Sequence, residues 1–490
     1  MDKKEKLNYI SARKDATIKE VMENIEKAGS KIAFVTDENK KLIGVVSDGD
    51  MRRALLAGKN LDIRVENIMT KNPIMAREGA PATELLDKML EKSIQEIPLV
   101  DKNGVLVSFV TLSELKSIPL SSPDITHKEV EIISQVLSTP YLSIGPRVKE
   151  FEKKMAEYVG VKYAVAVNSG TSGLHLCVRS LDIKDGDEVI TTPFSFIASA
   201  NCMLFERAKP VFVDIDENTL CIDVNKIEEK ITKKTKAILP VHIFGHPCEM
   251  DKIMEIAQKH NLAVIEDACE SLGSEYKNKK TGSFGNAAVF AFYPNKQITT
   301  GEGGIVITND EKTAKLCQSM RNQGRDEGDS WLSHSRLGYN YRMTEVSAAL
   351  GVTQMERIKE ILGKREAVAQ AYNKKLADIG GIKIPFVEKN VKMSWFVYVV
   401  RLDERFSRKD RDKITQKLKE MGISARDYFP PIHLEPFYVE MFGYKTGDFP
   451  VTEKVSESTI ALPFYNNLTE KEIDYIANSL RQIIQSLDNT

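Results

Sequence analysis

The chain has 490 residues, with 69 Lys and Arg against 70 Asp and Glu, so its formal net charge is -1. This balance gives no electrostatic reason to expect nucleic acid or an anionic membrane as a partner. The N-terminus lacks the apolar stretch of a secretory signal, and no apolar run approaches the ~20 residues that span a bilayer, so a cytoplasmic protein is expected. The six cysteines are scattered without a CxxC pair. Their pattern predicts reduced thiols and no metal site.

An internal repeat occupies the first 118 residues. The spacing from Asp37 to Asp101, 64 residues, also separates Ser47 from Thr111. In each copy a helical stretch precedes a short apolar strand, a turn containing Asn and a second apolar strand; the first copy reads IKEVMENIEKAG, IAFVTD and LIGVVSDGD. A helical period followed by two short apolar runs predicts a β-α-β-β unit in each copy.

Two such units in tandem resemble a pair of CBS domains, and VENIMTKNPIMA is similar to the junction between them. In that family a Ser or Thr, followed three residues later by Asp, holds a ribose beside an adenine pocket. The resemblance implies that Ser47 and Asp50 bind an adenine nucleotide in the first copy and that Thr111 does so in the second, where Glu114 stands in place of the Asp. A purely structural role as a packing module is an equal alternative.

The segment SIPLSSPDI at residues 117–125 is rich in Pro and Ser and separates the repeat, residues 1–118, from the rest of the chain. Over residues 119–370, short apolar runs such as YAVAVN, DEVITTPF and LAVIEDA alternate with helical stretches. This alternation predicts an α/β domain with a mainly parallel sheet buried on both faces. Residues 371–490 have a mixed pattern that predicts a smaller α+β domain.

Three motifs in the α/β part point to chemistry. NSGTSGLHL follows the strand YAVAV, which places Thr171 and Ser172 at a strand-to-helix turn where N–H groups bind phosphate. The strand LAVIEDA ends in Asp267, at the edge where α/β sheets bind ligands. Lys296 lies between a strand and a Gly-rich segment, a position suited to a lysine that forms an imine. Each motif alone has an ordinary structural explanation, whereas their order favours one shared site.

From about Ser121 to the C-terminus, the chain resembles the DegT-type nucleotide-sugar aminotransferases, in motifs that include NSGTSGLHL, TTPFSFIASAN, EDACESLGSEYKNKKTGSFG, FAFYPNKQITTGEGG and LGYNYRMTEVSAALG. The resemblance implies the fold-type I architecture, a three-layer α/β/α sandwich with a smaller α+β domain, and pyridoxal 5'-phosphate (PLP) as cofactor. It also implies transfer of an amino group from an amino acid, glutamate, to a nucleotide-linked keto sugar. The expected acceptor is a 4-keto-6-deoxy hexose used in surface-glycan biosynthesis.

Carried onto this sequence, the resemblance implies that Lys296 holds PLP through an imine and moves protons, and that Asp267 pairs with the pyridine nitrogen. The other implied positions are Thr171 and Ser172 at the phosphate, Phe196 on the ring face, Glu270 beside the ring hydroxyl, Asn340 or Arg342 at the phosphate of the neighbouring subunit's cofactor, and His433 near the sugar. A site completed across a subunit boundary implies a homodimer or a larger assembly.

The sequence departs from the family pattern five residues before the lysine, where many relatives carry Ser and this chain has Ala291. Loss of one neutral hydrogen bond to the phosphate costs about 0.5–1.5 kcal/mol net, which weakens the site without abolishing it. His242 receives no role. For Phe196, the alternative interpretation without the family resemblance is an ordinary core aromatic.

Three other functions are open to the same scaffold. A related group of dehydratases replaces the lysine with His, so Lys296 argues against that reaction. A cyclitol aminotransferase, acting on a carbocyclic ketone, requires only a different substrate pocket. A nucleotide-sensing regulatory protein with a non-catalytic aminotransferase-like half is disfavoured by the intact set of Lys296, Asp267 and Thr171.

Overall fold

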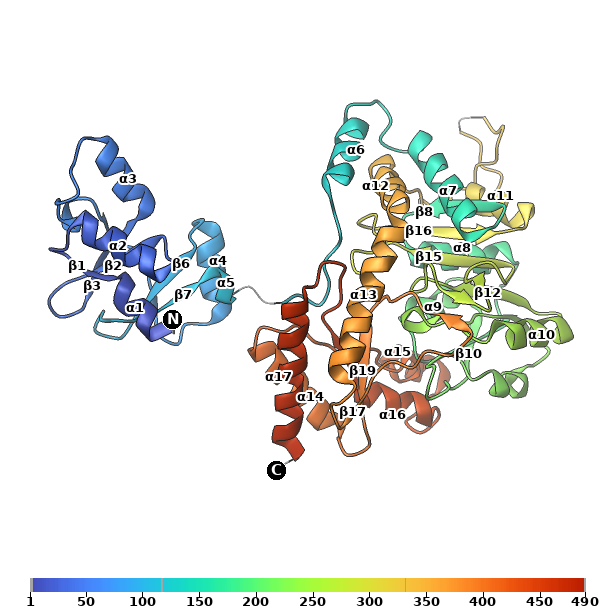
Figure 1. Ribbon diagram of the computed structural model, residues 1–490. Helices are drawn as coiled ribbons and strands as arrows, with labels where there is room; N and C mark the ends of the chain where they lie inside the picture. Colours follow the sequence, from blue (N-terminus) through green and yellow to red (C-terminus); the bar gives the residue numbers. More distant parts are fainter. Residues whose placement is uncertain (1–2, 116–117, 331, 489–490) are drawn as a thin grey trace. The chain divides into compact units, whose positions relative to one another are not determined.

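The computed structural model of the chain describes residues 3–115, 118–330 and 332–488. Its internal contacts divide the chain into two units, Met1–Ser117 and Ile118–Thr490 (Figure 1). Each unit is described by itself. Within the described residues, no helix is long and apolar enough to cross a bilayer.

The first unit contains two β-α-β-β copies, and this part of the fold prediction is confirmed. The elements of the first copy are β1 (Ser11–Arg13), α2 (Ile18–Ala28), β2 (Ile32–Thr36) and β3 (Leu42–Ser47). Those of the second are β5 (Ala76–Arg77), α4 (Ala82–Glu91), β6 (Glu96–Val100) and β7 (Leu106–Thr111). In each copy the first strand pairs in parallel with the second, and the second pairs antiparallel with the third.

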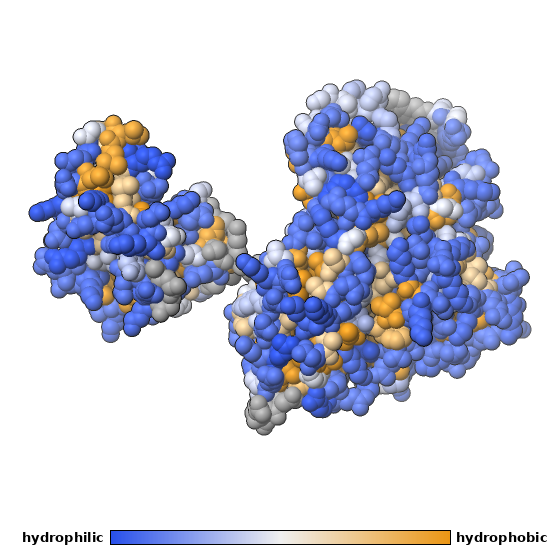
Figure 2. Space-filling model, in the orientation of Figure 1, coloured by the Kyte–Doolittle hydropathy of each residue, from blue (hydrophilic) through white to orange (hydrophobic). Residues whose placement is uncertain are grey.

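Local chemistry explains the boundaries of helix α2. Thr17 and Glu20 form a reciprocal capping box at its start, and Gly29 ends it with a left-handed φ of 56°. Contact between the two copies includes Phe34 and Phe109, whose ring centroids are 6.0 Å apart. The remaining elements of this unit are α1 (Lys3–Ile10), α3 (Asp48–Leu56), the 3-10 helix Val65–Asn67, β4 (Thr70–Lys71) and α5 (Leu112–Leu115). Apolar residues gather at the end of α3, where Leu56 is 83% exposed (Figure 2).

The second unit is built on a seven-stranded sheet in the order β10-β9-β11-β12-β15-β16-β8. Its strands are β8 (Tyr163–Val167), β9 (Glu188–Thr191), β10 (Lys209–Phe212), β11 (Thr235–Ile238), β12 (Ala263–Asp267), β15 (Ala287–Ala291) and β16 (Gly304–Thr308). Only β16 runs antiparallel to its neighbours in this sheet. The predicted mainly parallel sheet is confirmed.

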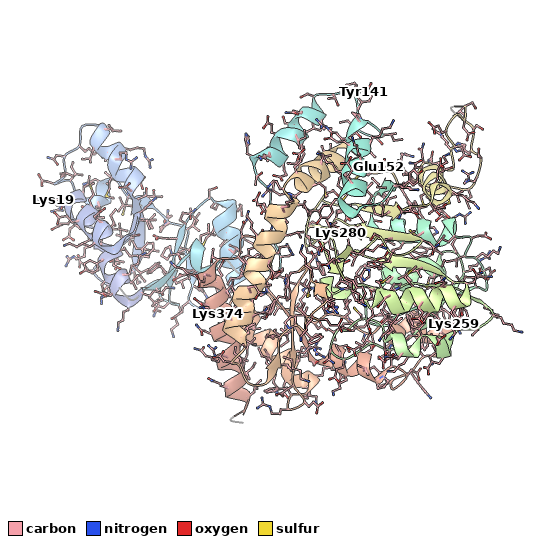
Figure 3. The ribbon with its side chains drawn as sticks, turned by 45° about the vertical axis from the view of Figure 1, so that its right-hand side comes forward. Lys19, Tyr141, Glu152, Lys259, Lys280 and Lys374 are labelled. Atoms are coloured by element: carbon pink, nitrogen blue, oxygen red, sulfur yellow. The ribbon has the colours of Figure 1, made fainter. Side chains whose placement is uncertain are left out.

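Helices cover both faces of this sheet. Successive residues of a strand point to opposite sides, so each strand can place apolar side chains in the layers on both faces. Val165 and Val167 of β8 belong to one buried cluster, whereas Ala164 and Ala166 belong to another. Glu152 of helix α7 accepts the Ala166 N–H at 2.9 Å and is labelled in Figure 3. The helices of this part are α6 (His127–Leu137), α7 (Pro146–Val159), α8 (Gly170–Ser180), α9 (Ala198–Leu204), α10 (Met250–His260), α11 (Glu311–Arg321), α12 (Glu345–Glu356) and α13 (Ile358–Leu376).

The C-terminal part adds a three-stranded antiparallel sheet with helices. Its elements are β17 (Ile382–Lys383), β19 (Tyr398–Leu402), α14 (Arg408–Glu420), α15 (Pro436–Phe442), α16 (Pro450–Ser458), β20 (Thr459–Leu462) and α17 (Glu470–Asp488). A second small sheet consists of β13 (Glu275–Tyr276), β14 (Lys279–Lys280) and β18 (Val391–Lys392). Short 3-10 helices lie at Val224–Lys226, Glu228–Lys230, Ile243–Gly245 and Ile432–Leu434. A separate domain from residue 371 stays a prediction.

Candidate active site

A cavity of about 500 Å³ lies at the carboxyl ends of the parallel strands of the second unit. Its volume is within the range of small-molecule and cofactor sites, roughly 300–1,000 Å³. Five of the positions predicted from the sequence line it together, and they come from four separate stretches of the chain: Thr171, Phe196, Asp267, Glu270 and Lys296.

Asp267 is the last residue of β12, so its carboxylate lies at the edge of the sheet where ligands bind. The side chain is buried, and both of its oxygens accept hydrogen bonds. Oδ2 accepts from the hydroxyl of Ser199 at 2.6 Å, and Oδ1 accepts from the backbone N–H of Cys269 at 3.1 Å. The Ser199 hydroxyl is itself 2.6 Å from that of Ser195. This network fixes the orientation of one anion at the floor of the cavity.

Lys296 follows β15 and brings its amine to the same cavity. Its Nζ is 3.5 Å from Oε1 of Glu270 and 3.9 Å from the centroid of the Phe396 ring. The other oxygen of Glu270 accepts the backbone N–H of Phe244 at 2.8 Å. Burial raises the pKa of Glu270, and the charge of Lys296 opposes that shift. The lysine is therefore held between a buried carboxyl group and the face of an aromatic ring.

The start of helix α8 also borders the cavity. Ser169 caps the helix, because its hydroxyl accepts the N–H of Ser172 at 3.1 Å. The first N–H groups of a helix have no carbonyl of a preceding turn to bind, so they are available to a phosphate. Gly170 permits the close packing here, since a Cβ at this position would lie 2.8 Å from the Cβ of Ala291. Thr171 lines the cavity.

Ser172 is not among the cavity residues. Its hydroxyl donates to Oδ1 of Asn168 at 2.7 Å and lies 2.8 Å from the Ser169 hydroxyl. The predicted contact of Ser172 with a phosphate stays a prediction, because its N–H donates to the Ser169 hydroxyl and its own hydroxyl donates to Asn168. Phe196 lines the cavity and is 60% exposed, which is unlike an ordinary core aromatic.

Three other predicted residues lie outside the cavity of their own chain. Asn340 is exposed, and its backbone carbonyl accepts the amide of Asn168 at 3.3 Å. Arg342 donates to Oδ1 of Asn322 at 3.2 Å. Their predicted role at a neighbouring subunit stays a prediction. His433 is fully buried, and its Nε2 is 3.1 Å from Oε1 of Glu453. A direct contact between His433 and a sugar has no support in this placement.

His242 is a structural residue. It is fully buried, its Nδ1 accepts the backbone N–H of Cys248 at 3.1 Å, and its Nε2 is 3.1 Å from Oε2 of Glu266. Glu266 also accepts the N–H groups of residues 282, 284 and 285, so the pair joins β12 to two loops. This network supports the strand that presents Asp267.

In the first unit, the residues implied in nucleotide binding serve as helix caps. Ser47 and Asp50 form a capping box at the start of α3, with their side-chain oxygens 2.7 Å apart. The N–H of Thr111 donates to Oε2 of Glu114 at 2.8 Å in the equivalent position of the second copy. Glu114 also pairs with Lys3 at 3.1 Å. Nucleotide binding here stays a prediction.

Several residues important for the cavity give no signal in the sequence. Ser199 belongs to a motif that the family resemblance covers, yet nothing in the motif shows which of its serines reaches Asp267. Phe396, Tyr428 and Phe429 line the cavity from the C-terminal part of the chain, far from Lys296 in sequence. Only the folded chain brings them together.

The cavity fits PLP, a cofactor with an anionic phosphate, a ring nitrogen that binds a proton and an aldehyde. Helix α8 offers N–H groups for the phosphate, Asp267 an anion for the ring nitrogen, and Lys296 an amine for the aldehyde. Fold and site together define a PLP-dependent enzyme of the α/β type.

The comparison with known proteins gives the family. The chain belongs to the DegT/DnrJ/EryC1/StrS aminotransferase family, whose sequence model matches residues 123–481, and residues 4–57 and 65–120 each match the CBS domain. It is 40% identical over 375 residues to GDP-perosamine synthase of Caulobacter vibrioides, covering 76% of this chain and 100% of the relative. It is 37% identical over 381 residues to the spore coat polysaccharide biosynthesis protein SpsC of Bacillus subtilis, covering 76% and 98%.

Among solved structures, Helicobacter pylori PseC, an aminotransferase involved in the biosynthesis of pseudoaminic acid, superposes with a TM-score of 0.73 at 31% identity, covering 76% of this chain and 100% of PseC. The chain is a PLP-dependent sugar aminotransferase with N-terminal tandem CBS domains. The predictions of family, fold class, cofactor and enzyme class are confirmed.

Proposed function

We propose that this enzyme transfers the amino group of glutamate to the ketone of a nucleotide-linked 4-keto-6-deoxy hexose, in amino-sugar biosynthesis for surface glycans. The observation that carries the proposal is the convergence of Lys296 and Asp267 in one cavity of about 500 Å³. The similarity to GDP-perosamine synthase supports a nucleotide-linked acceptor, because 76% of this chain aligns with that whole protein.

The residues of the cavity divide the chemistry between them. Bound PLP supplies an aldehyde that accepts amines and a ring that withdraws electrons from the reacting carbon. The buried carboxylate of Asp267 would pair with the ring nitrogen of the bound cofactor and favour its protonated form. The amine of Lys296 takes a proton from the donor carbon and returns one to the sugar carbon, as a general base and then a general acid. Glu270, 3.5 Å away, orients that amine.

The open side of the cavity supports a homodimer. Phe196 and Tyr293 line the cavity, yet they are 60% and 52% exposed. Asn340, also exposed, does not line the cavity of its own chain. A second copy that brings its Asn340 over the first copy's Phe196 covers the exposed rings and completes the phosphate site. Sedimentation or light scattering measures this assembly.

Covalent trapping tests the central assignment. The protein reconstituted with PLP is reduced with borohydride and digested, and we expect the label on the peptide that contains Lys296. Lys296→Ala abolishes both the label and the absorbance of the bound cofactor, whereas the control Lys280→Ala, outside the cavity, retains both. A label on another lysine contradicts the proposal.

The substrate is tested with glutamate and a panel of keto compounds. We expect a product with one new amino group, detected by mass spectrometry, from UDP-, GDP- or dTDP-linked 4-keto-6-deoxy hexoses. Amination of keto-inositols alone replaces the proposal with a cyclitol aminotransferase.

For the first unit we propose an adenine nucleotide as ligand, bound at Ser47, Asp50 and Thr111. A rise in melting temperature with ATP, ADP or AMP supports binding, and no shift with any of them supports a packing module.

A further inference from the structure

A buried arginine on helix α13 binds the backbone of the segment whose Phe396 ring contacts Lys296. Arg365 is 3% exposed, and burial lowers its pKa to about 9, so the guanidinium still carries its charge at neutral pH. Its Nε donates to the carbonyl of Trp395 and its Nη2 to the carbonyl of Phe396, both at 2.7 Å. Its Nη1 donates to Oδ1 of Asn466 at 2.9 Å. Within the described residues, these partners are neutral oxygens, not carboxylates.

A buried charge without an opposite charge is costly, so its retention calls for a use. The planar fork of a guanidinium holds two acceptors in fixed directions, which the flexible single ammonium of lysine does not. Here the guanidinium donates hydrogen bonds to two successive carbonyls of one short segment, those of Trp395 and Phe396. The side chain of Phe396, 2% exposed, lines the cavity, and its ring centroid is 3.9 Å from Nζ of Lys296.

The same segment is held from the side of the catalytic lysine. Gln297, the residue after Lys296, donates its amide to the carbonyl of Ser394 at 3.1 Å and to that of Glu270 at 2.6 Å. The N–H of Ser394 donates to the hydroxyl of Ser274 at 3.0 Å. Residues 394–396 are thus fixed at one end to the turn that carries the lysine and at the other end to helix α13.

We propose that Arg365 is a positioning residue, which holds the ring of Phe396 against Lys296 and so keeps the amine directed into the cavity. The inference rests on the proposed role of Lys296 as the amine that joins PLP. A reacting group displaced by about 1 Å loses up to about 100-fold in rate, so a loose Phe396 slows the attack of the amine. The contact between the Lys296 side chain and the Phe396 ring also restrains Lys296 before the cofactor binds.

The test follows covalent binding of PLP to the full-length apoprotein by stopped-flow absorbance. The measured quantity is the first-order rate at saturating PLP, which separates the attack of the amine from the binding of the cofactor. For Arg365→Lys we expect a fall of about 10- to 100-fold. Phe396→Leu is expected to cause a similar fall, and the double variant little more than the larger single one, because both changes act through one contact.

Arg411 provides the matched control. It is also 3% exposed, and its Nη1 donates to the carbonyls of Ser456 and Thr459 at 3.3 and 3.4 Å. Unlike Phe396, neither Ser456 nor Thr459 lines the cavity, and Arg411 also donates to Oδ1 of Asp412 at 2.6 Å. Arg411→Lys is expected to lower the melting temperature by an amount comparable to Arg365→Lys while leaving the rate unchanged. A rate for Arg365→Lys equal to that of Arg411→Lys, or fully additive effects of the Arg365 and Phe396 changes, overturns the proposal.

If Arg365→Lys does not fold, Asn466→Ala takes its place, since it removes one acceptor and leaves both carbonyl contacts. We then expect a smaller fall in the rate of covalent PLP binding, and an unchanged rate contradicts the positioning role of Arg365. Failure of the wild-type protein to bind PLP at Lys296 is a separate outcome. That outcome contradicts the proposed function and the inference that rests on it, and it is seen before any variant is compared.

Discussion

The N-terminus of helix α8 gives a prediction that can be worked from the structure, through Ala291. This residue ends strand β15 and lines the cavity. Its Cβ lies 2.8 Å from the position that a Cβ on Gly170 would occupy, so the side chain at 291 faces the first turn of the helix. A hydroxyl placed there by Ala291→Ser is expected to point to the space where we propose that the N–H groups bind the phosphate.

The expected gain follows from the strength of such a contact. Because the phosphate is an anion, the range of about 0.5–1.5 kcal/mol for a neutral hydrogen bond is replaced by about 1.5–3 kcal/mol for a bond to a charged group. The serine must give up rotamer freedom, and the cavity admits water, so the lower end of the range applies. About 1.5 kcal/mol corresponds to a roughly tenfold lower dissociation constant for PLP. The assay is equilibrium titration of the apoprotein with PLP, followed by the absorbance of the bound cofactor.

Ala291→Cys is the control, because the cysteine side chain is close in size and shape to that of serine but its thiol is a weak donor. We expect the cysteine variant to bind PLP as the wild type does or slightly more weakly. If Ala291→Ser binds PLP no more tightly than Ala291→Cys, the phosphate does not lie at this end of helix α8, and the reasoning fails.

Two further predictions concern stability. Burial raises the pKa of Asp124, but hydrogen bonds outweigh it and bring the pKa from 3.8 to about 2; the donors are Lys364, Asn466 and Arg357. This stabilisation, about 2 kcal/mol, is therefore present above pH 3.8 and disappears as the pH falls through 2. Asp124→Asn should lose it at pH 7, measured by urea unfolding with tryptophan fluorescence, and an equal loss at pH 2 would contradict it. Ser47→Ala removes the N-cap of α3 and should destabilise the first unit by about 1 kcal/mol in calorimetry; an unchanged first unit would exclude the cap.

The sequence predicted those site residues whose position depends on local structure. Asp267 ends one strand of the large sheet and Lys296 follows another. The carboxyl ends of parallel strands meet at one edge, so the order of motifs was enough to bring the two residues together. The family resemblance places both Thr171 and Ser172 at the phosphate, although adjacent residues of a helix point about 100° apart. The structure directs only Thr171 into the cavity and leaves the Ser172 hydroxyl bound to Asn168.

Residues that depend on long-range packing could not be predicted in this way. Phe396 is 100 residues from Lys296, in a segment whose apolar pattern indicates only a strand. The contact of Ser199 with Asp267 spans 68 positions, and two serines of one motif, Ser195 and Ser199, compete for it before the fold is known. His433 lies in the 3-10 helix Ile432–Leu434, and its ring centroid is 4.7 Å from that of Phe449, a contact that its sequence does not indicate.

The repeat shows how one short motif satisfies two physical demands. A Ser or Thr followed three residues later by an acid is a ribose-binding pattern in CBS domains, and it is also a capping box. In both copies the structure shows hydrogen bonds of the capping type, at Ser47 and Asp50 and at Thr111 and Glu114. Because the cap alone accounts for the motif, its presence does not discriminate a nucleotide site from a packing module. Ligand titration does.

In the aminotransferase part of the chain, the reactive residues and the residues that direct them are different. The amine of Lys296 and the carboxylate of Asp267 define the chemistry, yet each is directed by a residue far away in the sequence, Phe396 for the amine and Ser199 for the carboxylate. A chain with both reactive groups but a displaced supporting residue keeps its cofactor class while losing rate, because misplacement by about 1 Å is enough to slow a reaction. Variation at the supporting positions, with the reactive pair unchanged, is therefore the sharper probe of how this fold sets its turnover.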